Sequence, residues 1–231
     1  MPNTHLIIGS GGSVGTHLRT LLADAGDRVC NTHYHPRSSG QDRVGVSWTP
    51  FDLMSPQRDL PPLLQQLDQT SLKSLILFSH PSLDQEKKHP PLDQTLSLLP
   101  ALEGVRALFD SCIPLLKEGL ILTIMPSLSS LKARGYLKAR IYFGGLRGLL
   151  EEYSRGMDHQ SPRLLTLELI HIPGDPTPHI PSSILERMGR HTLEGNLPDS
   201  LSLARWILPL LQTPQTWLHG ETLRLPGGPF F

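Results

Sequence analysis

The sequence lacks the features that mark secreted, membrane-bound or nucleic-acid-binding proteins. Its 231 residues include only two cysteines, Cys30 and Cys112, too few for a disulfide framework, which favours a reducing compartment. Basic and acidic residues number 21 each, so no net charge draws the chain to nucleic acid. No apolar run approaches the length that crosses a bilayer, and no signal peptide is recognisable at the N-terminus. We therefore expect a cytoplasmic protein that binds neither nucleic acid nor membrane.

Short apolar segments alternate with segments of helical periodicity along the whole chain. Strands joined by helical crossovers form parallel sheets that are covered on both faces. The pattern predicts one doubly wound Rossmann-type α/β domain over residues 1–231, with a central parallel sheet of about seven strands and helices on both faces. Strands are expected at 5–10, 28–34, 43–52, 71–80, 119–127, 163–174 and 221–228, and helices at 13–25, 61–72, 93–117, 137–155 and 199–212.

A glycine-rich turn, "IIGSGGSVG", lies between the first predicted strand and the first predicted helix. Glycine lets a backbone turn tightly and approach a phosphate closely, and a helix N-terminus offers free N–H groups and a positive dipole end. A purely structural turn would also use glycine. We expect a nucleotide pyrophosphate site made by Gly9, Ser10, Gly11, Gly12, Ser13, Val14 and Gly15.

Several motifs in order along the chain resemble those of the short-chain dehydrogenase/reductase family. The family's first turn reads T-G-x-x-x-G-[IV]-G, and here it becomes Ile8 to Gly15 with serine replacing the middle glycine. Tyr136 and the "GGL" at 144–146 fall where the family's active-site helix has Y-x-x-x-K and a later G-L. "IHIPG" is similar to V-x-P-G, and "WLHGETLRLPGG" is similar to the family's C-terminal motif. The resemblance covers the whole length and implies an NAD(P)-dependent oxidoreductase.

The resemblance also implies which residues hold the cofactor. NAD-using members have an acidic residue at the end of the second strand, but residues 31–39 contain no carboxylate. Arg37 can hold a 2′-phosphate there, so we expect NADP rather than NAD, although a polar surface loop would look the same. His33 and His35 make a poor metal site without a third ligand, so no metal is expected. The other cofactor contacts implied by the resemblance are His33, Tyr34, Asp52, Leu53, Ser79, Arg140, Pro173, Gly174 and Thr177.

Family members catalyse with four residues: asparagine, serine, tyrosine and lysine. Tyrosine is the general acid/base, lysine lowers its pKa and binds ribose, serine polarises the substrate oxygen, and asparagine holds a water in the proton relay. Here the tyrosine is Tyr136, the lysine is replaced by Arg140 and the asparagine by Ala101. The serine position falls on Pro126 or Ser127, and because the loop before Tyr136 is shorter than usual, Ser129 or Ser130 could also serve; we assign it to Ser127. Arginine keeps the charge but cannot release a proton, so the usual relay is interrupted.

Two hypotheses follow from these departures. The first is an NADP-dependent oxidoreductase that transfers hydride to or from a small carbonyl, alcohol or imine compound, with a substrate loop at about 174–198. The second is a non-catalytic protein of the same fold that binds a nucleotide, or nothing, and acts as a regulator or scaffold. Because family members usually pair through the two long helices, at 93–117 and 137–155 here, we expect a homodimer or homotetramer.

Overall fold

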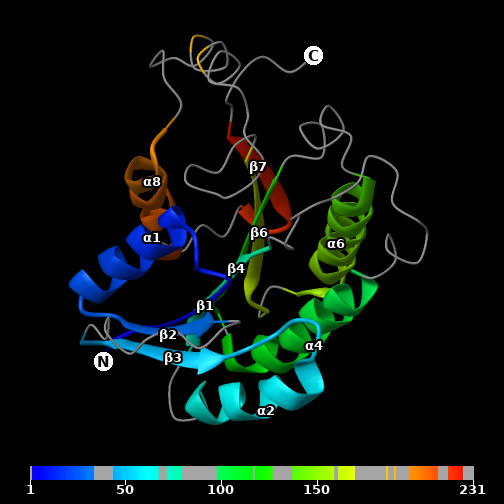
Figure 1. Cartoon of the computed structure of the whole chain (residues 1–231), viewed down its shortest axis with the longest axis horizontal. Helices are drawn as coiled ribbons and strands as arrows, with labels where there is room; N and C mark the ends of the chain where they lie inside the picture. The colour runs from blue at the N-terminus through cyan, green and yellow to red at the C-terminus, as the bar shows by residue number, and fades with distance from the viewer. Residues whose placement is uncertain are drawn as a thin grey trace.

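The computed structural model is a seven-stranded parallel sheet with helices on both faces (Figure 1). It describes residues 2–33, 44–67, 72–79, 98–116, 118–126, 137–158, 161–169, 186, 190, 198–212 and 218–225. In spatial order the strands are β3 (Val46–Pro50), β2 (Arg28–His33), β1 (Thr4–Ile8), β4 (Leu72–Phe78), β5 (Leu120–Pro126), β6 (Arg163–Leu169) and β7 (Glu221–Leu225). Every neighbouring pair is parallel, which confirms the fold class predicted from the sequence.

In the part of the chain that the structure describes, five helices cover the sheet in two groups. The helices α1 (Ser13–Asp24) and α8 (Ser200–Gln212) pack together on one face. The helices α2 (Pro56–Leu67), α4 (Leu99–Leu116) and α6 (Leu137–Gly156) cover the other (Figure 1). Each face therefore has its own hydrophobic core. Alternate residues of β1 divide between them, because Leu6 and Ile8 pack beneath α4 and α6 whereas Ile7 packs beneath α1 and α8.

Burial on both faces explains the apolar composition of the central strands. All seven residues of β5 are buried, and so are five of the seven residues of β4. Fully burying an aliphatic side chain stabilises a fold by about 1.5–3 kcal/mol, so these two strands anchor the sheet. Cys30 and Cys112 are both buried free thiols, and burial raises the pKa of Cys112 to about 12.

The predicted start of the second helix is wrong. The second helix was expected to begin at Pro61, but α2 begins at Pro56 and contains Pro61 and Pro62 in its interior. Ser55 starts the helix, because its carbonyl oxygen accepts hydrogen bonds from the backbone N–H groups of Arg58 and Asp59 at 3.2 and 3.4 Å. Proline suits the first helical position, where no N–H is needed, so Pro56 rather than Pro61 marks the start.

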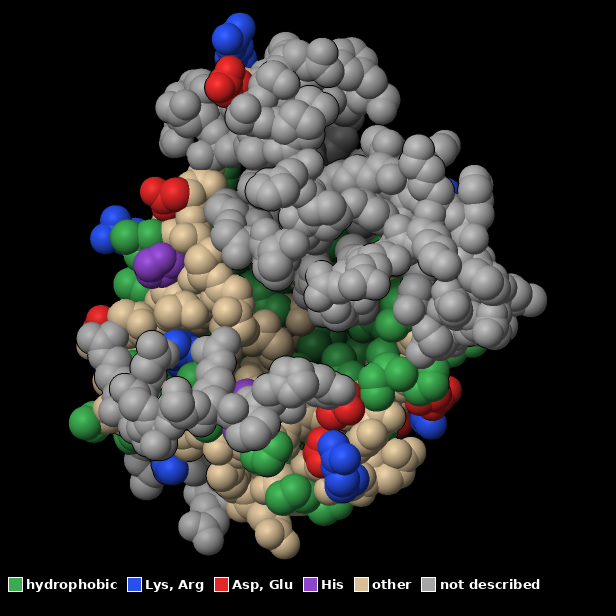
Figure 2. Space-filling model, viewed as in Figure 1, with side chains coloured by type: hydrophobic (Ala, Val, Ile, Leu, Met, Phe, Trp, Pro, Cys, Tyr) green, Lys and Arg blue, Asp and Glu red, His purple; other side chains and the backbone are tan. Residues whose placement is uncertain are grey.

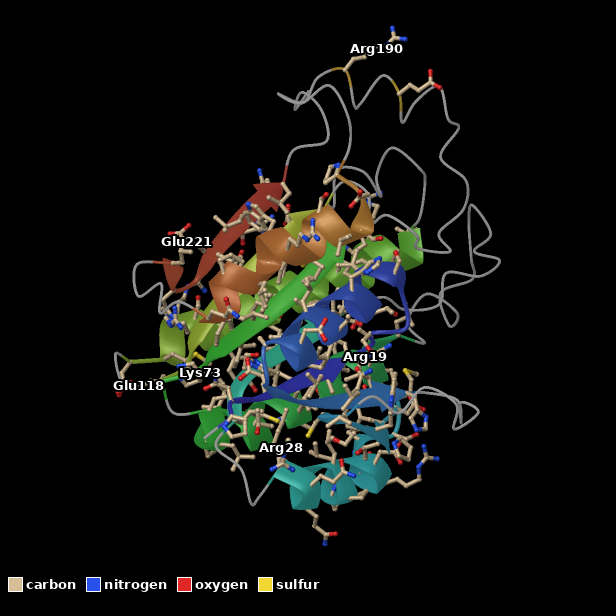
Figure 3. All side chains as sticks on the ribbon, turned by 90° about the vertical axis from the view of Figure 1, so that its left-hand side faces the viewer. Arg19, Arg28, Lys73, Glu118, Arg190 and Glu221 are labelled. Atoms are coloured by element: carbon tan, nitrogen blue, oxygen red, sulfur yellow. The ribbon has the colours of Figure 1, made fainter. Side chains whose placement is uncertain are left out.

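Because all seven strands are parallel, their carboxyl ends lie at one edge of the sheet. From β1 the chain adds β2 and β3 on one side and then crosses to β4 on the other, so the order reverses between β1 and β4. In open α/β sheets ligands bind at such a reversal, outside the carboxyl ends. Figure 3 labels Arg28, Lys73, Glu118 and Glu221 at the amino-end edge on the left, with Arg19 toward the opposite edge.

Candidate functional site

The glycine turn follows β1 directly at the carboxyl edge, and two of its glycines cannot be replaced without strain. Gly9 has φ +76°, and a Cβ there would lie 2.5 Å from the backbone oxygen of Phe78. A Cβ on Gly15 would lie 2.7 Å from the Cα of Ser10. By contrast, a Cβ on Gly12 would meet no heavy atom within 4 Å. The absence of a side chain at Gly9 therefore lets the turn lie against β4, and its absence at Gly15 lets α1 lie against Ser10 of the turn. Gly12 faces open space.

The first turn of α1 is suited to an anion. Gly12 precedes the helix in an extended conformation, with φ −79° and ψ 172°, and among the described residues no side chain caps the helix N-terminus through Gly12. The first turn, Ser13 to Thr16, carries no acidic residue that would compete with a phosphate. Backbone N–H groups and the positive end of the helix dipole at this position stabilise negative charge. The chain can therefore hold a pyrophosphate at the expected place.

A buried polar network beneath the turn was not predicted from the sequence. Ser10 is 0 % exposed, and the surrounding hydrogen bonds fix the Asn31 amide with its oxygen toward Arg19. In that orientation the amide oxygen accepts from Arg19 Nη1 at 2.9 Å and from Ser10 Oγ at 2.8 Å, and its nitrogen donates to the Ile7 carbonyl at 3.3 Å. The Arg19 guanidinium also lies over the Trp48 ring, 4.7 Å from its centroid. The network ties the turn to β2 and α1.

A sequence signal for this network does exist. Arg19 interrupts the buried stripe of α1 formed by Val14, Leu18 and Leu22, and it is itself only 8 % exposed. A cation on the buried face of a helix requires polar partners nearby. Asn31 is the matching polar residue within the buried part of β2, at 0 % exposure.

His33 ends β2 beside the glycine turn. Its ring lies 6.1 Å from the Trp48 ring, and its Nδ1 is buried with no hydrogen-bond partner among the described residues. The neighbouring Thr32 Oγ1 accepts a hydrogen bond from the Gly9 N–H at 3.4 Å. This is the strand end where the sequence predicted the adenosine ribose to bind.

Asp52 and Leu53 lie between β3 and α2. The Asp52 carboxylate accepts a hydrogen bond from the Met54 N–H at 2.9 Å, so Asp52 shapes this turn. The backbone of Leu53 approaches α4 closely, since a Cβ on Gly104 would lie 1.9 Å from the Leu53 oxygen. Gly104 thus fixes the Asp52–Leu53 segment against the helix.

Ser79 immediately follows β4 at the carboxyl edge. Its backbone N–H donates to the Ile124 carbonyl at 3.1 Å, which continues the pairing with β5. Its hydroxyl hydrogen-bonds the Tyr142 hydroxyl of α6 at 2.8 Å, and both residues are buried, at 1 % and 2 % exposure. Burial raises the pKa of Tyr142. The sequence singled out Ser79 but gave no role to Tyr142.

The predicted catalytic positions are only partly described. Arg140 lies exposed on α6, and Ala101 is buried on α4 at 6 % exposure. Tyr136 immediately precedes α6, and it lies outside the described residues. The other predicted site residues that lie outside the described residues are Tyr34, Arg37, Ser127, Pro173, Gly174 and Thr177.

The face at the carboxyl ends of the strands has an apolar centre. Figures 1 and 2 look onto the carboxyl ends of the strands, and in Figure 2 hydrophobic side chains gather in a hollow at the middle of this face. No group of three or more His, Cys, Asp or Glu side chains in the described part of the chain is arranged to hold a metal ion. No helix in the described ranges is long and apolar enough to cross a membrane.

Solved structures resemble this chain over almost its whole length. A short-chain dehydrogenase from Leptospira borgpetersenii, solved with NAD⁺, superimposes with a TM-score of 0.78 at 16% identity, over 99% of this chain and 92% of that one. An enoyl-acyl carrier protein reductase from Bacillus cereus, solved with NADP⁺ and an indole naphthyridinone, gives a TM-score of 0.81 at 13% identity, over 98% and 95%. The chain has the short-chain dehydrogenase/reductase fold.

A glucose/ribitol dehydrogenase of this fold from Brucella melitensis gives a TM-score of 0.77 at 16% identity, over 98% of this chain and 96% of that one. No protein-family model and no curated protein sequence matches the chain. The resemblance inferred from the sequence is thus confirmed for the fold. The same fold carries many activities, so the function has to be argued from the site.

Proposed function

We propose that this protein is an NADP-dependent oxidoreductase of the short-chain dehydrogenase/reductase type. The observation that carries the proposal is the geometry of the glycine turn. Gly9 and Gly15 have no room for a Cβ, Gly12 faces open space, and the uncapped first turn of α1 follows at the carboxyl edge. A backbone held in this way is shaped for a pyrophosphate.

The cofactor would be held by residues from several strand ends. The turn from Gly9 to Gly15 would hold the pyrophosphate, and His33, Tyr34 and Arg37 would surround the adenosine ribose. Arg37 would pair with the 2′-phosphate, which is why NADP is proposed over NAD. Asp52 and Leu53 would contact the adenine. At the other half of the cofactor we place Ser79, Arg140, Pro173, Gly174 and Thr177.

A nicotinamide cofactor, when bound, would supply or accept the hydride, while this chain's residues act on the proton and the substrate oxygen. Tyr136 donates a proton to the carbonyl or imine in reduction, and accepts it in oxidation. Arg140, four residues further along the chain, stabilises the tyrosinate by its charge and binds ribose hydroxyls. Ser127 hydrogen-bonds the substrate oxygen and polarises it. The substrate is a small carbonyl, alcohol or imine compound, bordered by the loop at about 174–198.

A second candidate function is a nucleotide-binding regulator or scaffold without catalysis. One observation favours it: Ala101 is buried in α4, and its side chain has no polar atom to hold a relay water. Together with Arg140 in place of lysine, this interrupts proton exchange between Tyr136 and bulk water. We favour the oxidoreductase because Tyr136 and Arg140 keep the four-residue spacing of the family's Y-x-x-x-K, and arginine retains the positive charge of the lysine.

We also propose that the protein is a cytoplasmic homodimer or homotetramer that pairs through α4 and α6. Leu137 and Ile141 on α6 are each 37% exposed, and Leu99 on α4 is 43% exposed. A Cβ on Gly144 or Gly148 would meet no heavy atom within 4 Å, so another helix can approach there. Light scattering at micromolar concentration tests this, and a monomer alone would contradict it.

A titration of the purified protein with NADPH and NADH, followed by nicotinamide fluorescence, tests the proposal. We expect saturable binding of NADPH, and then oxidation of NADPH on addition of members of a panel of small carbonyl and imine compounds. Binding without turnover on any member would favour the regulator. Failure of both dinucleotides to bind would contradict the oxidoreductase and favour a scaffold that binds no nucleotide.

A further inference from the structure

The hydroxyl pair of Ser79 and Tyr142 has a feature that packing alone does not require. Two hydroxyl groups carry two protons, and the single hydrogen bond of 2.8 Å between them uses only one. In the described part of the chain neither oxygen has a further hydrogen-bond partner. One proton of the pair is therefore left to donate elsewhere, at a site that is almost closed to water.

The acidity of the two hydroxyls determines which of them donates the hydrogen bond within the pair, and which keeps a proton for another acceptor. Burial raises the pKa of Tyr142, and the hydrogen bond with Ser79 offsets only part of that increase, so the phenol keeps its proton at neutral pH. A phenol is a stronger acid than an alcohol and is therefore the stronger donor of the two. Tyr142 accordingly donates to Ser79, and the Ser79 O–H is the one that remains. The Phe143 ring, 5.1 Å from the Tyr142 ring and edge-on to it, helps to fix the phenol.

The position of Ser79 indicates what its O–H meets. Ser79 is the first residue after β4, on the β4 side of the order reversal between β1 and β4 where this fold binds ligands. Its surroundings on this face are apolar, since its partner Tyr142 belongs to the same buried hydrophobic cluster as Leu77 of β4 and Met125 of β5. An apolar setting disfavours a charged acceptor and suits an uncharged oxygen, such as a sugar hydroxyl or a carboxamide.

We propose that Tyr142 is a positioning residue that aims the Ser79 hydroxyl, through their hydrogen bond, at an uncharged oxygen of the bound dinucleotide. This inference rests on the proposed function, because it needs a dinucleotide at the carboxyl edge. Tyr142, on α6 and two residues beyond Arg140, would thereby contribute to the affinity for the dinucleotide. Tyr142 itself does not touch the ligand.

Substitution of each hydroxyl tests the pair. Tyr142→Phe keeps the ring and removes the donor, so the Ser79 hydroxyl loses its fixed direction and the Kd for NADPH should rise about two- to tenfold, as for one net hydrogen bond. Ser79→Ala should raise it by a similar factor, and Ser79→Thr, which retains the hydroxyl, should restore most of the affinity. The double variant Ser79→Ala/Tyr142→Phe should bind no more weakly than Ser79→Ala alone, because the two groups act as one unit.

Tyr153→Phe is the matched control. Tyr153 lies on the same helix, and its hydroxyl hydrogen-bonds Asp110 and the Arg106 carbonyl of α4, so the substitution also removes a helix–helix contact. It lies toward the amino-end edge, and NADPH affinity should not change. Thermal unfolding without nucleotide measures the stability of each variant separately from its affinity. Each single variant leaves one buried hydroxyl without its partner, whereas the double variant removes both hydroxyls. If a single variant fails to fold, the double variant should still fold and can be measured instead.

The possible outcomes separate this inference from the proposed function. If the wild-type protein binds NADPH and Tyr142→Phe binds it equally well, the pair only packs α6 against the sheet and the inference is overturned. The same holds if Tyr153→Phe weakens binding as much as Tyr142→Phe. If the wild-type protein binds neither NADPH nor NADH, the proposed function fails, and this inference fails with it.

Discussion

The two edges of the sheet contain similar polar side chains but differ in what those side chains are able to do. At the amino-end edge Ser74, His5 and Asp27 form a chain of the residue types that hydrolases use for catalysis. His5 Nδ1 lies 2.7 Å from Ser74 Oγ, and His5 Nε2 lies 3.2 Å from Asp27 Oδ2. At the carboxyl edge the polar groups are the networks around Ser10 and Ser79.

The two groups of polar side chains differ because of where they lie in the sheet. Ser74 is 0 % exposed and His5 1 % exposed, and both are internal to strands that begin at this edge, so no substrate reaches them. Asp27 also accepts hydrogen bonds from the Asn3 backbone and side-chain nitrogens, each at 3.1 Å, which ties β1 to the turn before β2. The carboxyl edge instead has an open glycine, an uncapped helix and strand ends. Substitutions at the amino end should therefore change stability, and substitutions at the carboxyl end should change ligand binding and turnover.

The largest effect is expected at Tyr136. Tyr136→Phe removes the transferable proton and keeps the ring, so turnover should fall by about 10²–10⁴ while NADPH affinity holds. Arg140→Ala should reduce both, because it removes a ribose contact and the charge that stabilises the tyrosinate. Steady-state kinetics on an identified substrate, together with fluorescence titration, measures both effects. Unchanged turnover in Tyr136→Phe would show that another group is the acid.

The glycine turn should show the next largest effect. In Gly15→Ala the new Cβ would lie 2.7 Å from Ser10 Cα and 2.8 Å from the Ser10 carbonyl oxygen, so backbone must move. Overpacking of this kind costs roughly 1–3 kcal/mol, and the displaced turn should also bind NADPH more weakly. Gly12→Ala is the control, since its Cβ meets nothing within 4 Å. Its stability should stay within about 0.5 kcal/mol of the wild type in urea unfolding. Equal destabilisation by both substitutions would contradict the geometry described for the turn.

Cofactor preference should give a smaller difference. One additional charge-assisted hydrogen bond from Arg37 to the 2′-phosphate contributes about 1.5–3 kcal/mol, so NADPH should bind roughly ten- to a hundredfold tighter than NADH. Arg37→Ala should remove that preference and leave NADH affinity unchanged. Isothermal titration with both dinucleotides measures this. Tighter binding of NADH by the wild type would show that residues 31–39 do not recognise a 2′-phosphate.

The sequence predicted the fold well because its signals are local and strong. The apolar runs of β4 and β5, the glycine turn and the stripe of α1 each reflect burial or backbone geometry that a short segment encodes. The hydroxyl pair could not be predicted in the same way, because Ser79 and Tyr142 are 63 residues apart and only the packing of α6 on β4 brings them together. Pro61 was misleading for a related reason: proline favours a helix start, but it does not identify which of several prolines starts the helix. The roles of Tyr136, Ser127 and Arg37 stay predictions.

The smallest effect should be a pH dependence of stability that originates at the amino-end edge. Burial lowers the pKa of His5 more than the neighbouring Asp27 raises it, and Lys73 lowers it further. The unfolded chain therefore binds a proton on His5 at a higher pH than the folded chain does. Stability should accordingly fall as the pH drops below the unfolded value of about 6.5, and it should be fully retained above it.

His5→Gln isolates this contribution. The variant loses the hydrogen bonds to Ser74 and Asp27, which should reduce stability at pH 7.5 by about 1–3 kcal/mol. Because glutamine does not titrate, the further loss between pH 7.5 and pH 5.5 should be shallower than in the wild type. Urea unfolding at pH 7.5, 6.5 and 5.5 measures both quantities, and the range stays above the pH at which ordinary carboxylates protonate. Parallel pH profiles for the two proteins would show that His5 does not titrate on unfolding. A change in NADPH affinity at pH 7.5 beyond that expected from partial unfolding would break the distinction between the two edges.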